Sequence, residues 1–288
     1  MKNLGIIVNL KKENAFNIIK ELVSWLLNKD CNIFISKEVL TQINIPSNKI
    51  QNIEETDIER LEMVIVLGGD GTLLHTVKFL KGRDVPILAI NLGKLGFLTE
   101  ITQDEIYSSL ERVFEKQYTI NYKIMIEAQV IRNNKKAAVF YALNDAVVNK
   151  GSLARLINFE LFIQDEYIAT YFADGIIVST PTGSTAYSLS AGGPIVYPSL
   201  NALVITPICP HSLTHRPMVL TSENTILIKI ASEDEDINLT CDGQEGYSLQ
   251  NGDCIAITKA TRQTLLICSE KRSFFEVLRA KLNWGKRK

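Results

Sequence analysis

The chain has 288 residues, of which 46% are hydrophobic and 22% charged, as is ordinary for a globular protein, and this length allows two domains or one large one. Its 31 Lys and Arg nearly balance its 32 Asp and Glu, so there is no basic field to attract nucleic acid. No apolar run reaches the roughly 18 residues of a membrane helix, so we expect neither a membrane partner nor, from the charge balance, a nucleic-acid partner. The five cysteines are scattered and lack C-x-x-C spacing, which fits reduced thiols and predicts a cytoplasmic protein.

Strand and helix patterns alternate over the first 119 residues. Four apolar runs of strand length predict buried strands at 4–8, 31–35, 63–67 and 85–90. Helical spacing of apolar residues predicts helices at 15–29, after Gly71 and at 103–116. A capping box, Thr102 with Glu105, opens the last of these, whereas the polar stretch 43–60 predicts a connecting loop with a short helix. We therefore expect an N-terminal α/β domain (1–119) whose parallel sheet is covered on both faces and binds ligands at the carboxyl ends of its strands.

The periodicity changes to two after Tyr118, as in the alternation of apolar and polar residues over 157–163. A hairpin-type turn, Asn251-Gly252-Asp253, joins two further strand patterns. This predicts an all-β, β-sandwich-like domain over 120–265. The pattern returns to helix near the end of the chain, and a lone helix needs a surface, so we expect 266–288 to pack on the α/β domain.

A glycine-rich turn follows the apolar run at 63–67. A strand, such a turn and a helix N-terminus together make an anion site, and the residues predicted to bind phosphate there are Gly68, Gly69, Gly71 and Thr72. Asp70 in the middle of this turn would repel phosphate. Its presence is explained if its carboxylate takes the proton of a hydroxyl that attacks phosphorus. The alternative is that Asp70 is the N-cap residue of the helix.

A second dense stretch, 174–194, combines glycines with small hydroxyl residues directly after a strand pattern. Its hydroxyls offer many hydrogen-bond donors, and Tyr187 could stack on a base. We interpret it as a ligand loop, the alternative being a Ser/Thr-rich surface loop. Cys209, His211 and His215 cluster like metal ligands, but no fourth ligand lies near them in the sequence, and we predict no protein metal site. The chain also lacks a P-loop motif and a complete dinucleotide fingerprint.

Gly68-Gly69-Asp70-Gly71-Thr72, taken together with the 174–193 block, resembles the NAD kinase family. Further family blocks follow in the right order, at Asn144-Asp145, Thr206–Leu213 with Arg216-Pro217, and Asp242-Gly243-Gln244. The glycine-rich turn by itself is shared with lipid kinases and phosphofructokinases, whereas the block from Thr180 to Tyr187 is highly specific. One departure is Phe172, at a position where some relatives carry a basic residue.

The resemblance implies ATP-dependent phosphorylation of the adenosine-ribose 2′-hydroxyl of NAD. It also implies a divalent cation, Mg²⁺ above all, bound mainly through substrate phosphates, and a homo-oligomer, either a dimer or a tetramer. By matching position, Asp70 is the expected proton acceptor. The residues expected to bind NAD are Asp70, Gly71, His75, Asn144, Asp145, Arg155, Asp174, Thr185, Ala186, Tyr187, Ser188, Leu189, Ser190 and Gln244.

Two other functions share part of this pattern. A lipid or sphingoid kinase would have the same Gly-Gly-Asp-Gly turn, but the Thr182–Ser190 block argues against it. A sensing module would bind NAD without turnover, but the intact Asp70 argues against that.

Overall fold

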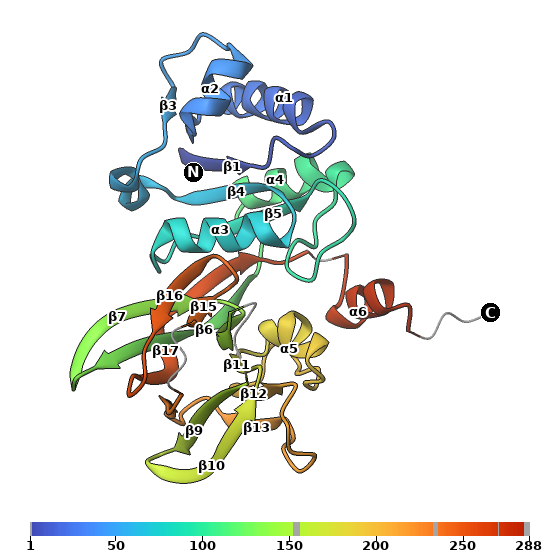
Figure 1. Ribbon diagram of the computed structural model, residues 1–288. Helices are drawn as coiled ribbons and strands as arrows, with labels where there is room; N and C mark the ends of the chain where they lie inside the picture. The colour runs from blue at the N-terminus through green and yellow to red at the C-terminus, as the bar shows by residue number, and fades with distance from the viewer. Residues whose placement is uncertain (1, 152–155, 233–235, 270, 285–288) are drawn as a thin grey trace. The chain divides into compact units, whose positions relative to one another are not determined.

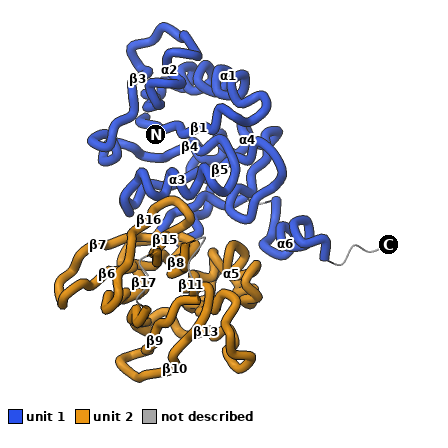
Figure 2. The backbone as a smooth tube through the Cα atoms, in the orientation of Figure 1, with its two compact units in different colours: residues 1–122, 264–288 blue, residues 123–263 orange. Residues whose placement is uncertain are grey.

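The computed structural model describes residues 2–151, 156–232, 236–269 and 271–284. The chain forms two compact units, shown in Figure 2: residues 1–122 with 264–288, and residues 123–263. Two strands pass from one unit to the other, β6 (Ile120–Arg132) and β17 (Cys254–Ile267). The predicted mixed α/β class is confirmed. Within the described ranges, no helix is both long and apolar enough to span a bilayer.

The first unit contains a parallel sheet with the strand order β5-β4-β1-β2-β3. These strands are β1 (Asn3–Val8), β2 (Asn32–Ile35), β3 (Ile50–Asn52), β4 (Met63–Gly68) and β5 (Ile87–Asn91). The end of β17 pairs in parallel with β5, through Leu266 opposite Ile87. Every residue of β4 and β5 is buried, which explains their continuous apolar runs, because strands of a parallel sheet are covered on both faces.

Helices cover both faces of this sheet. Residues of α1 (Ala15–Asn28), α2 (Lys37–Ile43) and α4 (Ile106–Phe114) form one hydrophobic cluster with the face of β4 that carries Ile65. Another helix, α3 (Asp70–Leu80), contacts β4 and β1. Figure 1 shows α1 and α3 on opposite sides of the strands. The sheet therefore has the covered parallel arrangement that the sequence pattern predicts.

The stretch expected to be a loop with a short helix, 43–60, has more structure than predicted. It contains β3, which pairs in parallel with β2, and a 3₁₀ helix, η1 (Glu55–Arg60), which is the expected short helix. The helix α2, immediately before this stretch, was also not predicted. Sequence periodicity misses β3 because it has three residues at the sheet edge, two of them exposed, which is too short for an alternating pattern.

The second unit is built on antiparallel strands in two sheets. One sheet contains the order β10-β9-β14-β17, with β6 pairing β17 and β7, and the other has the order β13-β12-β11-β8-β15-β16. Their remaining bounds are β7 (Lys135–Ala142), β8 (Asp145–Lys150), β9 (Ile157–Ile163), β10 (Glu166–Ala173), β11 (Gly175–Ser179), β12 (Ala202–Ile208), β13 (Met218–Thr221), β14 (Ile226–Ile230), β15 (Ile237–Cys241) and β16 (Glu245–Leu249).

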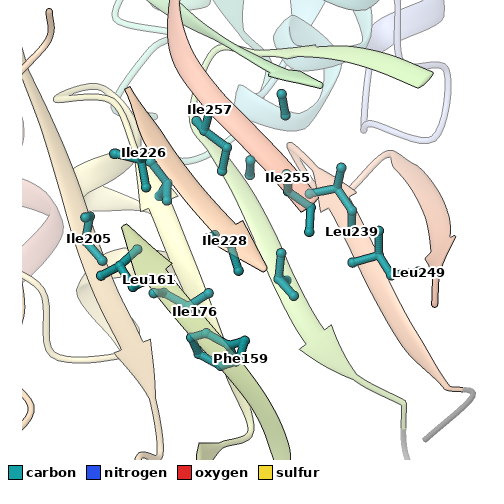
Figure 3. Close-up of a cluster of buried hydrophobic side chains, with 14 of the residues drawn as sticks. Phe159, Leu161, Ile176, Ile205, Ile226, Ile228, Leu239, Leu249, Ile255 and Ile257 are labelled. Atoms are coloured by element: carbon teal, nitrogen blue, oxygen red, sulfur yellow. The ribbon is translucent and has the colours of Figure 1, made fainter. Parts of the chain in front are cut away.

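One hydrophobic core fills this second unit. It includes Phe159 and Leu161 of β9 with Ile228 of β14 from one sheet, and Ile176 of β11 with Leu239 of β15 from the other, as Figure 3 shows. The alternation predicted over 157–163 holds for its first five residues, in which every second side chain is buried. Because successive side chains point to opposite faces of a strand, one face of each sheet lies in the core.

The last helix, α6 (Phe274–Leu282), belongs to the first unit. It begins with a capping box, in which Ser273 and Glu276 bond to each other's backbone amides, and it buries Val277 and Leu278. Just before it, the Arg272 guanidinium donates to Glu105 Oε2 at 2.6 Å and to the Glu100 carbonyl at 2.9 Å. These bonds attach the C-terminal segment to residues that follow β5.

Candidate active site

The glycine-rich turn places Asp70 at the carboxyl end of β4. Gly69 is extended and occupies the N-cap position, so Asp70 is the first residue of α3 and not its cap, and the N-cap interpretation is wrong. Its carboxylate instead accepts hydrogen bonds from the loop after β5. Phe97 N donates to Oδ2 at 2.9 Å, and Leu98 N and Thr99 N both donate to Oδ1 at 3.1 Å. The aspartate therefore holds two strand-end loops of the first unit together.

The three glycines of this turn have different surroundings. A Cβ on the buried Gly68 would overlap the Thr72 side chain, so packing requires glycine there. Gly69 and Gly71 have nothing within 4 Å of a Cβ position, which leaves their backbone open to a ligand at the N-terminus of α3. His75, the other predicted residue on this helix, is exposed.

A cavity of about 350 Å³ lies in the second unit. Four predicted NAD residues line it: Asn144 and Asp145 at the start of β8, and Ala186 and Tyr187 at the start of the short helix α5 (Tyr187–Ser190). The other lining residues are Val147, Asn149, Thr240, Asp242 and Gly243. The side-chain oxygens of Asn144 and Asn149 are buried without a hydrogen-bond partner among the described residues. Two residues that line the cavity therefore each carry a buried side-chain oxygen whose hydrogen bonds the protein alone does not complete.

Two carboxyl groups, those of Asp145 and Asp242, line this cavity. Asp242 accepts hydrogen bonds from three consecutive amides, those of Leu143 at 2.8 Å, Asn144 at 2.7 Å and Asp145 at 3.2 Å. Burial, with a smaller contribution from the charge of Asp242, raises the pKa of Asp145 to about 7. Burial also raises the pKa of Asp242, although its three amide donors oppose this. Near neutral pH the Asp145 carboxyl can therefore act both as a hydrogen-bond donor and as an acceptor.

The hydroxyl-rich loop before α5 uses several of its hydroxyls to hold itself in place. Thr180 Oγ1 donates to the Leu143 carbonyl at 2.6 Å, Ser184 Oγ donates to the Pro181 carbonyl at 2.6 Å, and Ser188 Oγ pairs with Thr206 Oγ1 at 2.8 Å. The hydroxyls of Thr180, Ser184 and Ser188 are therefore already engaged in hydrogen bonds within the protein. Gly183 packs against the Asn144 backbone, where a Cβ would clash, so this loop supports the cavity wall.

The remaining predicted residues are dispersed around these features. Asp174 forms an ion pair with Lys150 at 3.1 Å. Ser188 is fully buried, Thr185 and Leu189 are half-buried, and Ser190 and Gln244 are exposed. Arg155 lies outside the described residues. Phe172 is exposed on β10.

The described part of the chain contains no group of three or more His, Cys, Asp or Glu residues that could hold a metal ion. Among the candidate ligands at 209–215, His215 stacks on Tyr171 with ring centroids 4.0 Å apart.

Sequence reasoning missed several residues of both features. Around Asp70 these are Gly96 and Thr99, and in the cavity they are Asn149, Thr240 and Asp242. The loop after β5 could be noticed from its position at the carboxyl edge of the sheet. The role of Asp242 has no local signal, since its amide partners lie 97 to 99 residues earlier in the chain.

Comparison with known proteins places the chain in a family. Residues 4–118 match the family model of the ATP-NAD kinase N-terminal domain, and residues 143–269 match that of the ATP-NAD kinase C-terminal domain. The chain is 44% identical over 288 residues to an NAD kinase of Syntrophotalea carbinolica, with 100% of both chains covered. It is 42% identical to an NAD kinase of Caldanaerobacter subterraneus over 98% of this chain and 99% of the relative.

Two solved structures have similar folds. Yeast NADH kinase in complex with NADH matches with a TM-score of 0.93 and 28% identity, covering 100% of this chain and 89% of the yeast chain. An NAD kinase from Archaeoglobus fulgidus in complex with ATP matches with a TM-score of 0.75 and 25% identity, covering 96% of this chain and 99% of the other.

Proposed function

The chain belongs to the ATP-NAD kinase family, and from that premise we propose that it transfers phosphate from ATP to the adenosine-ribose 2′-hydroxyl of NAD, giving NADP, with Asp70 as the proton acceptor. The observation that carries this proposal is the placement of Asp70. Its carboxylate is fixed by amide donors, and there is open space at the Cβ positions of the two glycines that flank it. Phosphoryl transfer depends chiefly on positioning and on electrostatic stabilisation, and this turn supplies the fixed acceptor it needs.

A carboxylate in this position has a chemical purpose. A ribose hydroxyl is a weak nucleophile at neutral pH, and a positioned base typically contributes about 10²–10⁴ in rate. Asp70 would take the hydroxyl proton as the oxygen attacks the terminal phosphorus of ATP. The N-terminus of α3, with Gly68, Gly69, Gly71 and Thr72, would stabilise the phosphate charge.

We assign the cavity of the second unit to NAD. Asn144, Asp145 and Asn149 give this cavity a polar lining, and the Asp145 carboxyl can accept hydrogen bonds from ribose hydroxyls or donate to an acceptor. Tyr187, 46% exposed at the rim, offers a ring for stacking. The family resemblance adds Gly71, His75, Arg155, Asp174, Thr185, Ala186, Ser188, Leu189, Ser190 and Gln244 to the proposed NAD-binding residues.

The proposed divalent cation would be bound mainly through substrate phosphates. This fits Mg²⁺, which prefers phosphate oxygens and retained waters to a cage of protein ligands. When bound, such a cation neutralises negative charge on the phosphates.

We also propose a cytoplasmic homo-oligomer, a dimer or a tetramer. All five cysteines are free, which suits a reducing compartment. The strand β10, at the end of its sheet, exposes Tyr167, Ile168 and Phe172, and an exposed apolar edge of this kind suits contact with another subunit. Sedimentation of the pure protein measures the subunit number, and a monomer at micromolar concentration would contradict this assignment.

Turnover by the pure protein tests the proposed reaction. NAD, ATP and Mg²⁺ are incubated with the protein, and NADP is measured with an NADP-specific dehydrogenase; parallel reactions replace NAD with a sphingoid base or diacylglycerol. We expect NADP to form and the lipids to remain unphosphorylated. Binding of NAD without NADP formation would indicate the sensing module, and phosphorylation of the lipid would indicate the lipid kinase.

A further inference from the structure

The two carboxylate oxygens of Asp70 have different surroundings. Oδ1 accepts three hydrogen bonds, from Leu98 N, Thr99 N and the Thr99 hydroxyl, each at 3.1 Å. Oδ2 accepts one, from Phe97 N at 2.9 Å. A carboxylate oxygen has about two lone-pair sites, so Oδ1 is saturated by donors while Oδ2 can accept one more hydrogen bond.

The direction of the Thr99 hydroxyl follows from its neighbours. Asn91 Oδ1 accepts a bond from Gly93 N at 2.7 Å, and because an N–H group can only donate, this contact fixes the orientation of the Asn91 amide. The Asn91 NH₂ group then faces Thr99 Oγ1 at 2.7 Å and also can only donate. The single hydroxyl proton of Thr99 must therefore point to Asp70 Oδ1.

Asn91 and Thr99, which lead to the Asp70 carboxylate, are buried in the first unit. Thr99 is 0% exposed and Asn91 is 4% exposed. Asn91 N donates to the Ile101 carbonyl, and Leu92 N donates to the Gly68 carbonyl, so the backbone joins the loop to the glycine-rich turn. A Cβ at Gly96 would overlap both the Asp70 carboxylate and Thr99 Oγ1, so this approach requires glycine. Buried networks in which every member is satisfied hold a single geometry.

We infer that Asn91 and Thr99 are positioning residues that orient the Asp70 carboxylate, and that Oδ2 is the atom that accepts the substrate proton. This inference rests on the proposed function. A proton on Oδ1 would face three donors, so it is excluded there, whereas Oδ2 has a free lone pair. In the transfer step the substrate O–H bond breaks, its proton forms a bond to Asp70 Oδ2, and the oxygen's electron pair forms the bond to phosphorus. The leaving ADP oxygen keeps the electron pair of the broken P–O bond.

Substitution of Thr99 tests this assignment. Thr99→Val keeps the shape and removes the hydroxyl, whereas Thr99→Ser keeps the hydroxyl. We expect Thr99→Val to lower kcat about 10- to 100-fold, because misplacement of a reacting group by about 1 Å can cost about 10²-fold. KM for NAD and ATP should stay within about threefold, since the hydroxyl contacts the base and neither substrate, and Thr99→Ser should recover most of the turnover.

Thr76 provides a matched control in the same unit. It is also 0% exposed, and its hydroxyl donates to the Thr72 carbonyl at 2.9 Å, not to Asp70. Thr76→Val should keep turnover near that of the wild type. If Thr99→Val fails to fold, Asn91→Asp tests the same network, because the carboxylate still accepts from Gly93 N but would draw the Thr99 hydroxyl proton away from Asp70. The same loss of kcat is expected for Asn91→Asp.

Three outcomes would overturn the inference. Turnover of Thr99→Val, or of a folded Asn91→Asp, within about threefold of wild type while Asp70→Asn is inactive would overturn it and leave the proposed function standing. An equal loss in Thr99→Val and Thr99→Ser would do the same, because the hydroxyl would then not be the cause. Absence of NADP formation by the wild-type protein would overturn the proposed function and this inference together.

Discussion

The protonation of Asp145 depends strongly on its surroundings. The residue is 5% exposed in the cavity wall, close to the charge of Asp242, and its pKa is raised from 3.8 to about 7. Between pH 4 and pH 7 the unfolded chain has released this proton while the folded chain still holds it. Folding therefore becomes less favourable as pH rises through that window, because the folded state must either keep the proton or bury a charge.

The variant Asp145→Asn removes this pH dependence. We expect the free energy of unfolding of the wild type to fall more steeply between pH 5 and pH 7 than that of Asp145→Asn, so that the variant gains relative stability as pH rises. Urea unfolding at several pH values measures both. Parallel curves for the two proteins would contradict the raised pKa of Asp145.

At the scale of elements, the attachment of α6 depends on one buried carboxylate. Glu105, 3% exposed, accepts from Arg272 at 2.6 Å and from Thr102 N at 2.9 Å, and Lys271 lies 3.4 Å from it. Burial opposes the charged form, but the bonds from Arg272 and Thr102 outweigh it and lower the pKa of Glu105 from 4.5 to about 2. Its contribution to stability is therefore complete above pH 4.5 and is lost as pH falls toward 2.

Glu105→Gln should destabilise the protein by about 3 kcal/mol at pH 7, because the substitution leaves the Arg272 charge without its partner. The difference from wild type should shrink between pH 4.5 and pH 3, as the wild-type glutamate gains a proton. Unfolding monitored in urea at pH 7, 4.5 and 3 gives the comparison, with Glu111→Gln on α4, the helix that follows Glu105, as the control. A difference that stays constant with pH would contradict the ion-pair explanation.

Most of the helices and strands that the sequence predicts are specified by local periodicity. The β4 strand, the α3 helix, the Thr102–Glu105 capping box and the alternation over 157–163 are each specified by residues within a few positions of one another. The edge strand β3 could not be predicted because it has only three residues, two of them exposed, and these are too few to show a period.

The contacts around the candidate site could not be predicted from the sequence, for a different reason. Asp70 is bonded to amides 27 to 29 residues away, and Asp242 to amides 97 to 99 residues away, so no sequence spacing connects them. The glycine-rich turn and the 174–194 block supplied most of the candidate site residues. The bonds of Thr180 to Leu143 and of Ser188 to Thr206 could not be predicted, because their partners lie 37 and 18 residues away in the chain.

At the scale of the whole molecule, the predicted NAD residues occur in both compact units. A ligand that binds the folded chain and not the unfolded one stabilises it by mass action. NAD at about 100 times its Kd should therefore add roughly 2.7 kcal/mol to the free energy of unfolding.

This stabilisation should depend on the cavity rim. Tyr187→Ala removes a stacking surface and should reduce the shift at the same NAD concentration, whereas Tyr122→Ala, at a tyrosine that is 58% exposed on β6, should not. Thermal unfolding of the three proteins with and without NAD measures this. If millimolar NAD leaves the wild-type melting curve unchanged, the cavity assignment is contradicted.

The turnover of Asp70→Asn tests the central claim most directly. The amide oxygen can keep the donors at the Oδ1 position, while the NH₂ group takes the Oδ2 position, where it loses the bond from Phe97 N and cannot accept a proton. We expect kcat to fall about 10²–10⁴-fold, with cooperative unfolding and NAD affinity retained. A variant that folds, binds NAD and phosphorylates it within a few-fold of the wild-type rate would contradict the assignment of Asp70 as the proton acceptor.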